Sequence, residues 1–246
     1  MSQRKSPGRR RECWSAGIPA APRSPQGPAL ESTPVEPPQS LPPPSAHALA
    51  LAGLPVAAAQ PPRVEALIAS EVVVVISRSR DPAREVHLAA CRRDLVPVVQ
   101  RPSGGGAVVL APGVVVASAL HVAAHESVFP DPYFASFCAA TAGALRSCGV
   151  DGVTRRGVSD LCLGDRKIAG TSLRLWRRRV LFQVSILVDP DLSLLDRYLA
   201  EPTRAPAYRA GRRHREFVTS LREAGCGVAR ATVAAALQAA LLLPPR

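Results

Sequence analysis

The chain has 246 residues, of which 47% are hydrophobic, and its formal net charge is +12. This length fits one domain with or without a tail, and no run of about 18 apolar residues predicts a membrane span. No zinc-finger spacing and no basic stripe with interleaved aromatic residues indicate nucleic acid binding, so the positive charge better suits an acidic protein partner. We expect a soluble, cytoplasmic monomer.

Proline dominates the N-terminal quarter of the chain. Residues 1–62 contain 14 of the 25 prolines, including the run Pro42-Pro43-Pro44. Proline fixes φ and removes a backbone donor, so neither helices nor sheets propagate through such a segment. We therefore predict a disordered, proline-rich tail over residues 1–62 and a folded domain over residues 63–246.

The first half of the predicted domain consists mainly of strands. Residues 71–77 form a continuous β-branched run, which is typical of a buried strand. An Asp-Pro pair then suits the N-cap and first turn of a helix over residues 82–93. Residues 97–110 predict a strand, a glycine turn and a second strand, and residues 114–120 predict a further apolar strand.

The second half of the predicted domain adds most of the helices. Residues 153–163 and 166–188 predict strands on either side of a short turn, and therefore a hairpin. Helices are expected over residues 130–146, 191–199, 208–223 and 229–243. Because hairpin connections outnumber crossovers, we predict an α+β fold with a mixed, mainly antiparallel sheet and helices packed on it.

The first motif that indicates chemistry is a glycine-rich loop, Arg101-Pro102-Ser103-Gly104-Gly105-Gly106-Ala107-Val108-Val109. Three consecutive glycines cost backbone entropy and suit a chain that turns tightly or approaches a ligand. Without Cβ atoms, successive N–H groups can converge on an anion. The guanidinium of Arg101 suits phosphate or carboxylate. A flexible hairpin would explain the glycines alone, but the preceding Arg and Ser favour an anion-binding loop.

The second motif is centred on Lys167, within the segment Asp160 to Gly170. The chain has 29 arginines and only two lysines, and Lys167 is the only lysine outside the N-terminal tail. A lysine ammonium is a compact point charge, which arginine does not reproduce. Lys167 follows a tight turn, and Gly170 leaves room for a ligand beside it. A solvated hairpin lysine and a lysine that binds a carboxylate or phosphate are equally consistent with this segment alone.

Together, the two motifs resemble those of the biotin/lipoate protein ligase family, and most closely the catalytic domain of lipoate–protein ligases and octanoyltransferases. That family has an Arg-Arg-x-Ser/Thr-Gly-Gly-Gly-Ala-Val loop followed by a Gly-Arg-Lys segment, and residues 101–109 and 160–170 match these in order. The resemblance covers about residues 70–222. It implies a catalytic domain like those of class II aminoacyl-tRNA synthetases and biotin ligases.

The resemblance also implies a role for each matched residue. Lys167 would bind the acyl carboxylate and then the adenylate, and Asp160 and Gly170 would support that pocket. Arg101 and the backbone of Gly104, Gly105 and Gly106 would hold the phosphates of ATP, with Ser103 in the same loop. The residues expected to line the nucleotide or acyl site are Ala107, Val108 and Val109.

The implied activity is the ATP-dependent attachment of lipoate or octanoate to one lysine of a lipoyl carrier domain through an acyl-adenylate. The carrier would be the glycine-cleavage H protein or a 2-oxoacid dehydrogenase E2 component. Mg²⁺ would arrive with ATP, because the six cysteines form no C-x-x-C pair and no protein metal site is predicted.

Departures from the family pattern leave other functions open. Gln100 replaces the first arginine of the family's pair, and no histidine lies among residues 182–185, where the family often has one. A catalytically degenerate protein that binds an acyl group or a carrier domain is therefore one alternative. A biotin–protein ligase is disfavoured, because that branch usually has a different loop.

An octanoyltransferase that uses an acyl-carrier donor and no ATP is the other alternative. One branch of that group uses a cysteine nucleophile upstream of the Gly-Arg-Lys turn. Cys148 is the only candidate in this sequence, although a buried small residue at the end of a helix is the commoner role for such a cysteine. A reactive cysteine needs a lowered pKa, which the sequence alone does not reveal.

Overall fold

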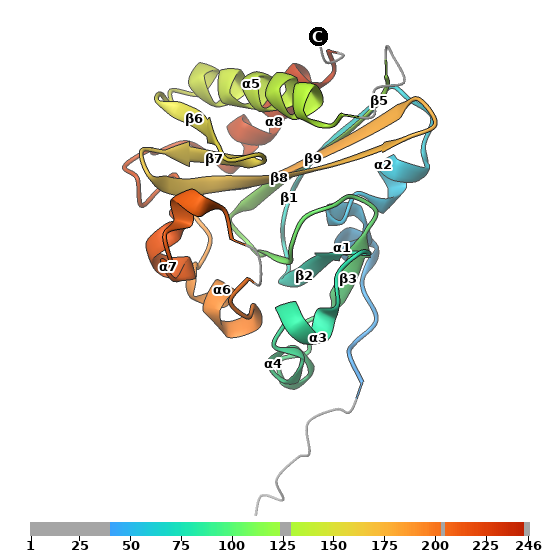
Figure 1. Cartoon of the computed structure of the whole chain (residues 1–246), viewed down its shortest axis with the longest axis vertical. Coiled ribbons are helices and arrows are strands. Elements are labelled where there is room, and N and C mark those ends of the chain that lie inside the picture. Colours follow the sequence, from blue (N-terminus) through green and yellow to red (C-terminus); the bar gives the residue numbers. More distant parts are fainter. Residues whose placement is uncertain (1–39, 124–128, 203–204, 244–246) are drawn as a thin grey trace, which may run out of the picture. The chain divides into compact units, whose positions relative to one another are not determined.

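The computed structural model describes residues 40–123, 129–202 and 205–243, which form two β-sheets and the helices around them (Figure 1). The larger sheet has six strands in the order β1-β5-β9-β8-β7-β6, and every neighbouring pair is antiparallel. Its strands are β1 (Arg63–Ile68), β5 (Val114–Val122), β6 (Val153–Arg156), β7 (Asp160–Leu163), β8 (Arg166–Trp176) and β9 (Arg179–Leu187).

The smaller sheet has three strands in the order β3-β2-β4. Its strands are β2 (Val73–Ser77), β3 (Val98–Arg101) and β4 (Val108–Leu110). β2 runs parallel to β3 and antiparallel to β4, and all five of its residues are buried, as its unbroken β-branched sequence predicts. The expectation of a mixed, mainly antiparallel α+β fold is confirmed, with the strands divided between two sheets.

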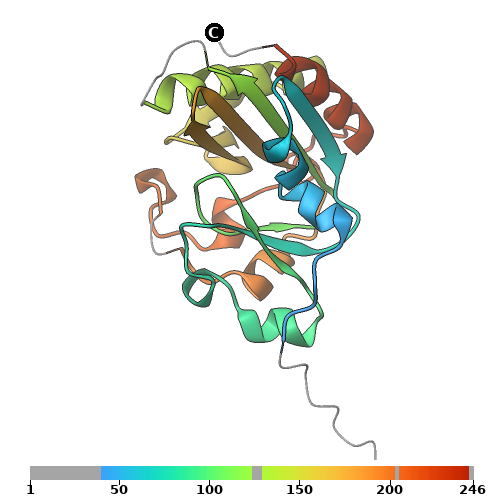
Figure 2. The same ribbon diagram turned by 90° about the vertical axis from the view of Figure 1, so that its right-hand side faces the viewer.

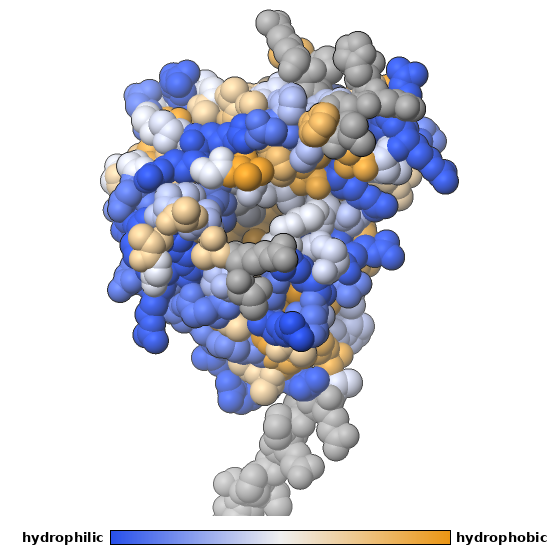
Figure 3. All heavy atoms as spheres, viewed as in Figure 1, coloured by the Kyte–Doolittle hydropathy of each residue, from blue (hydrophilic) through white to orange (hydrophobic). Residues whose placement is uncertain are grey.

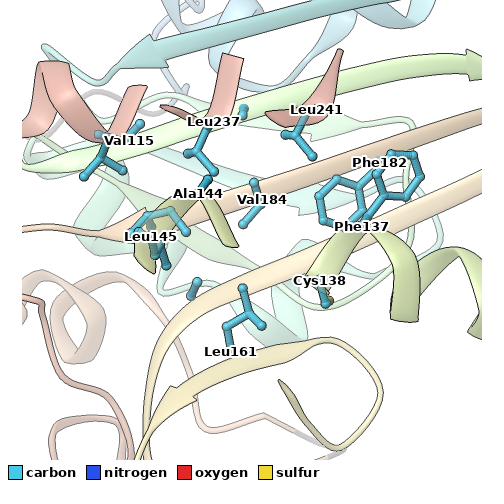
Figure 4. Packing of buried hydrophobic residues seen from close by; sticks show 14 of the residues in the cluster. Val115, Phe137, Cys138, Ala144, Leu145, Leu161, Phe182, Val184, Leu237 and Leu241 are labelled. Atoms are coloured by element: carbon cyan, nitrogen blue, oxygen red, sulfur yellow. The ribbon is translucent and has the colours of Figure 1, made fainter. Parts of the chain in front are cut away.

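Two long helices cover one face of the larger sheet, α5 (Asp131–Ser147) and α8 (Arg230–Leu241) (Figures 1 and 2). Both agree with the sequence prediction. Beneath them the rings of Phe137 and Phe182 stack with centroids 4.6 Å apart, inside the main apolar core (Figure 4). Among the described helices, none is both long enough and apolar enough to cross a membrane.

Alternation along β9 gives the sheet its two faces. Phe182 and Ile186 belong to the core under α5 and α8, whereas Gln183 and Leu187 line a cavity on the opposite face. Successive side chains of a strand point to opposite faces, so one strand supports the core and the cavity together. The smaller sheet lies on the cavity side of the larger one (Figures 1 and 2).

The predicted domain boundary at residue 63 is wrong for the segment before it. Residues 46–58 form two short helices, α1 (Ala46–Leu51) and α2 (Leu54–Ala58). The prolines are compatible with these helices, because Pro55 occupies the first turn of α2, where no backbone donor is needed. Leu51 and Val56 are each 1% exposed, so this segment is part of the folded body. Residues 1–39 of the predicted tail lie outside the described residues.

The predicted helix over residues 82–93 divides into α3 (Pro82–Glu85) and α4 (Leu88–Arg93). The Asp81 side chain accepts a hydrogen bond from the Ala83 N–H, which confirms the predicted N-cap. The helix breaks at Val86 because that residue forms a β-bridge with Leu199, which follows α6 (Ser193–Tyr198). A tertiary contact therefore overrides the local helical pattern.

The predicted helix over residues 208–223 is wrong. The structure has only a 3-10 turn, η1 (Ala207–Arg209), and one helical turn, α7 (His214–Phe217). Left-handed φ angles at Ala210 (+51°) and Gly211 (+75°) stop any helix there. The following backbone is extended instead, because it bonds to the larger sheet: the Thr219 N–H donates to the Lys167 carbonyl, 2.9 Å away.

Replacing Leu51 with alanine tests whether α1 belongs to the folded body. Truncating a buried leucine typically costs about 2–5 kcal/mol, so we expect the free energy of unfolding in urea to fall by that amount. Leu243→Ala, at a position that is 70% exposed, should change the free energy of unfolding by less than about 0.5 kcal/mol. Equally small changes in both variants would contradict the packing of α1.

Candidate active site

A cavity of about 400 Å³ lies between the two sheets. The glycine-rich loop, β8, β9 and the segment around α7 all contribute to its lining. Charged or titratable residues in the lining are Arg80, Arg101, Asp160, Lys167, Arg209 and His214. Apolar residues include Leu51, Val75, Val108, Leu110, Val116 and Leu187. The cavity therefore offers a cationic region and an aliphatic wall to the same ligand.

Arg101 holds the glycine-rich loop in place. Arg101 is only 6% exposed, and its guanidinium donates hydrogen bonds to the carbonyls of Val75 (3.2 Å), Gly104 (2.7 Å) and Gly106 (2.7 Å). Burial lowers the pKa of Arg101 to about 10, partly opposed by the nearby Glu85 carboxylate. Arg101 still lines the cavity, but most of its donors point at the loop itself. Its direct structural task is to shape the loop.

Glu85, at the end of α3, is a second anchor for the loop. Its Oε2 atom accepts a hydrogen bond from the Ala107 N–H at 2.9 Å, and its Oε1 atom lies 3.4 Å from Nε of Arg80. The side chain is only 10% exposed, so its charge faces Arg80 and Arg101 in a poorly solvated place. Glu85 lies in the helix that the Asp-Pro pair predicts, but the sequence alone did not mark it as a site residue.

The two central glycines satisfy geometric demands that other residues would not meet. Gly105 has a φ of +97°, and a Cβ atom there would lie 2.8 Å from Nη2 of Arg101. A Cβ on Gly106 would lie 3.3 Å from Oε2 of Glu85. Within the described residues, the N–H groups of Gly105 and Gly106 have no hydrogen-bond partner. Both residues line the cavity, so these donors are available to an anion.

Ser103 and Gly104 lie outside this cavity lining. Ser103 is 1% exposed, lies 2.8 Å from the hydroxyl of Ser172 and donates to the side-chain carbonyl of Gln183. The Gln183 amide in turn donates to the Ala52 carbonyl (3.0 Å) and to the Ser118 hydroxyl (3.2 Å). Gln183, which lies in the 182–185 stretch where the resemblance leads us to expect a histidine, thus ties the loop to the segment after α1. Sequence reasoning marked this position as a departure and missed its contacts.

Lys167 and Asp160 form the ion pair at the other side of the cavity. Nζ of Lys167 lies 2.6 Å from Oδ1 of Asp160, and the hydroxyl of Tyr208 donates to Oδ2 at 2.7 Å. Burial and the hydrogen bonds to Cys162 and Asp160 raise the pKa of Tyr208, so it remains a proton donor. A Cβ on Gly170 would lie 3.2 Å from Nζ of Lys167. Both motif predictions therefore describe one cavity: the loop and the lysine line it together.

Cys148 does not belong to this site. It follows α5, and its thiol lies 3.8 Å from the Thr232 carbonyl of α8, on the far face of the larger sheet. No described cysteine lines the cavity. Burial raises the pKa of the Cys162 thiol, the cysteine closest to Lys167 along the chain. The raised pKa disfavours the Cys162 thiolate, the form that a cysteine nucleophile requires.

Residues around α7 complete the cavity, and sequence reasoning did not place them in the site. The guanidinium of Arg209 is held by Glu201 at 2.7 Å and lies over the Phe217 ring at 5.2 Å. His214 is 9% exposed and lines the cavity. In the sequence, Arg209, His214 and Phe217 all fall on one predicted helix over residues 208–223. That helix is wrong, so it could not show which of them face the site.

No group of three or more His, Cys, Asp or Glu residues is arranged to hold a metal ion in the part of the chain that the structure describes. Asp160 is the carboxylate in the cavity lining, and Lys167 and Tyr208 already occupy its two oxygens. Any metal would therefore have to enter with an anionic ligand that supplies its own oxygens.

Residues 54–242 match the sequence model of a protein family, the lipoyl protein ligase A/B catalytic domain. The chain belongs to this family. The match begins in α2 and ends just after α8, so it covers both motifs and the α7 segment of this lipoyl ligase family member.

Two curated relatives align over 151 residues each. Lipoate–protein ligase 2 of Staphylococcus aureus (strain Mu50 / ATCC 700699) is 29% identical over 61% of this chain and 44% of the relative. Lipoate–protein ligase of Streptococcus pyogenes serotype M5 (strain Manfredo) is 28% identical over 61% and 43%. The aligned part thus spans less than half the length of these relatives.

Solved structures agree in fold. A T. acidophilum structure with bound lipoic acid has a TM-score of 0.65 at 21% identity, covering 81% of both chains. A lipoate–protein ligase A bound with ATP has a TM-score of 0.65 at 21% identity, covering 79% of this chain and 78% of the other. A Thermoplasma acidophilum lipoylation system, with a bi-partite ligase and its E2 lipoyl domain, gives 0.63 at 19%, covering 84% and 83%. The expected class II synthetase-like fold is confirmed.

Replacing Arg101 with lysine tests its task in the loop. One ammonium cannot span three carbonyls, and lost hydrogen bonds to a charged group cost about 1.5–3 kcal/mol each at most sites. We expect lower stability to urea and faster hydrogen exchange at the Gly104–Gly106 amides. Arg84→Lys, where the side chain is 79% exposed, is the matched control and should change neither. Unchanged exchange in Arg101→Lys would show that the loop does not depend on this guanidinium.

Proposed function

We propose that this protein attaches lipoate, or octanoate, to a specific lysine of a lipoyl carrier domain, using ATP and an acyl-adenylate intermediate. The observation that supports this most is that the Lys167 ammonium and the two unpaired glycine amides line one cavity with an aliphatic wall. Such a cavity suits a carboxylate head group, a fatty chain and a phosphate together. Family membership and the lipoate and ATP ligands of the structural neighbours agree with this proposal.

In the first step, an oxygen of the acyl carboxylate attacks the α-phosphorus of ATP. A bond forms between these atoms, the bond from the α-phosphorus to the bridging oxygen breaks, and pyrophosphate leaves with the electron pair. Lys167 would orient the carboxylate, and the Gly105 and Gly106 N–H groups would stabilise charge on the phosphate oxygens. Preorganised donors of this kind each contribute about 10²–10³ in rate. The Asp160 carboxylate and Gly170 keep the ammonium in place.

Mg²⁺ fits this scheme as a companion of ATP. Because the described carboxylate in the cavity is paired with Lys167, the phosphate oxygens of ATP and water would supply its ligands, as is usual for this ion. The ion would offset phosphate charge, while the residues of this chain position the two substrates.

In the second step, the amine of the carrier lysine attacks the acyl carbon and AMP leaves. The product is an amide on the carrier, either the H protein of glycine cleavage or the E2 component of a 2-oxoacid dehydrogenase. The neighbouring archaeal system, which includes an E2 lipoyl domain, motivates this choice of partner. The aliphatic wall around Val75, Val116 and Leu187 would hold the acyl chain during transfer.

The octanoyltransferase without ATP is the runner-up. One branch of that group uses a cysteine nucleophile, and the placement of Cys148 on the far face of the sheet argues against that residue in such a role. The degenerate binder is disfavoured for a different reason: Lys167 is retained in a chain with only two lysines, and it lines the cavity.

Mixing the purified protein with lipoate or octanoate, ATP–Mg²⁺ and an apo lipoyl domain tests the proposal. The carrier mass should rise by one acyl group, and only when ATP is present. A gain from octanoyl-carrier donor without ATP would instead indicate the transferase, and no gain with either donor would indicate the binder.

Replacing Lys167 with arginine should abolish most of this activity although the charge is retained. The planar guanidinium cannot take the place of a compact ammonium beside Asp160, so we expect a loss of about 10²–10³ in turnover. Cys148→Ala is the control and should modify the carrier at the wild-type rate. Near-normal turnover by Lys167→Arg would contradict the assignment of the site.

The net charge of +12 predicts that association with an acidic carrier depends on salt. We expect kcat/KM for the carrier to fall as NaCl is raised across the range in which the Debye length shrinks from about 30 to 8 Å. Pyrophosphate release from lipoate and ATP, measured without carrier, provides the comparison for salt effects on chemistry. Carrier modification that is insensitive to ionic strength would exclude electrostatic steering.

A further inference from the structure

His214 is a buried titratable group in the cavity to which the reaction above assigns no task. It begins α7, lines the cavity and is 9% exposed. One turn later, Val218 forms a β-bridge with Lys167, and the Val218 N–H donates to the His214 carbonyl at 2.8 Å. The backbone of His214 is therefore connected through Val218 to the strand that carries the site lysine.

The imidazole is oriented by carboxylates on one side. Nδ1 lies 3.5 Å from Oδ1 of Asp196 in α6 and 3.6 Å from Oε1 of Glu201. Glu201 is itself paired with the Arg209 guanidinium at 2.7 Å. With Nδ1 turned to these carboxylates, Nε2 is left without a hydrogen-bond partner among the described residues. A histidine whose Nδ1 faces carboxylates can use Nε2 as a base, because a carboxylate stabilises the imidazolium that forms.

The charge state also suits a base. Burial lowers the pKa of His214, and the Arg209 cation lowers it further, while Glu201 and Asp196 oppose both effects. A lowered pKa means that the imidazole is neutral at neutral pH and can accept a proton. The charged groups that face it come from α6, from η1 and from the residues between them.

The other titratable groups in the described lining are poor proton acceptors. Arg80, Arg101 and Arg209 are cations, and Lys167 is an ammonium paired with Asp160. Asp160 already accepts the Tyr208 hydroxyl and pairs with that ammonium, so both of its oxygens are occupied. Only His214 combines a place in the cavity with a neutral, unpaired ring nitrogen.

We propose that His214 is the general base that deprotonates the carrier lysine for attack on the acyl-adenylate, a role that rests on the proposed function. A lysine amine is almost fully protonated at neutral pH, so it cannot attack until a proton is removed. Asp196 and Glu201 are positioning residues that stabilise the imidazolium as it forms.

The proton and electron balance of the transfer is complete without another reactant. One ammonium proton of the carrier lysine passes to Nε2 of His214. The amine nitrogen then bonds to the acyl carbon, the bond from that carbon to the adenylate oxygen breaks, and AMP takes the electron pair. A second proton of the nitrogen follows to the phosphate of AMP. The products are the carrier amide, AMP and the imidazolium, which returns its proton to water.

A single-turnover experiment with His214→Gln separates this role from the rest of the reaction. Enzyme loaded with lipoyl-adenylate, formed from lipoate and ATP, is mixed with an apo lipoyl domain, and the carrier mass is followed in time. Loss of a general base slows transfer by about 10²–10⁴. Pyrophosphate release in the loading step should remain close to the wild-type rate, because adenylation needs no base.

Hydroxylamine and pH provide readouts that a structural defect would not reproduce. Hydroxylamine is uncharged at neutral pH, so the variant should transfer lipoate to it as fast as the wild type does. With the carrier, the wild-type rate should level off once His214 is neutral and fall as pH drops through its lowered pKa. In the variant, the logarithm of the rate should keep rising with pH as the lysine itself loses its proton.

His87→Gln is the matched control, because His87 is exposed and its ring contacts only the Arg197 carbonyl among the described residues. It should behave as wild type with both acceptors. Wild-type carrier transfer by His214→Gln, or equal slowing with hydroxylamine, would overturn the role of His214. If the wild type released no pyrophosphate from lipoate and ATP, the proposed function itself would fail, and the inference with it.

Discussion

The arrangement of the site depends on one buried cation. The Arg101 guanidinium donates its hydrogen bonds to the carbonyls of Val75, Gly104 and Gly106. These hydrogen bonds hold the glycine-rich loop against β2 and β3. A buried guanidinium is costly unless its donors are satisfied, so the loop cannot relax without leaving that charge unpaired. The carbonyls turn toward Arg101, and the N–H groups of Gly105 and Gly106 are left for the cavity. Arg101, a buried cation, thereby leaves two N–H donors that can face an anion in the cavity.

The ammonium opposite the loop is held by a different principle. Lys167 is a strand residue, and its position is fixed from three directions: by Asp160 on β7, by the extended chain at Val218 and by the missing side chain of Gly170. Tyr208 shares the carboxylate with it. The segment from η1 to Val218 therefore contacts both members of the Lys167–Asp160 ion pair. The side of the molecule seen in Figure 1 carries many hydrophilic residues with apolar ones between them (Figure 3).

The sequence was informative where local pattern and structure coincide. The unbroken valine run of β2, the spacing of α5 and the Asp-Pro start of α3 specify their own conformations, so these elements were predictable. The loop and Lys167 were recognisable because glycine triplets and a lone lysine are unusual in this composition. What failed depends on contacts distant in sequence. Nothing local marks the helices before residue 63 or the burial of Gln183, and the 208–223 segment has helical residue types but bonds to a sheet edge.

The Gln183 side chain connects two segments that are distant in sequence, and this affects how the protein unfolds locally. Gln183, in the middle of the larger sheet, holds the Ala52 carbonyl, the Ser118 hydroxyl and the loop residue Ser103 at once. Next to it, Gly53 leaves no space, since a Cβ atom would lie 2.2 Å from the Gln183 amide nitrogen. The segment after α1 and the glycine-rich loop are therefore both held by the Gln183 side chain. Unfolding of the segment around residue 52 would break these hydrogen bonds, so we expect it to occur together with disordering of the glycine-rich loop.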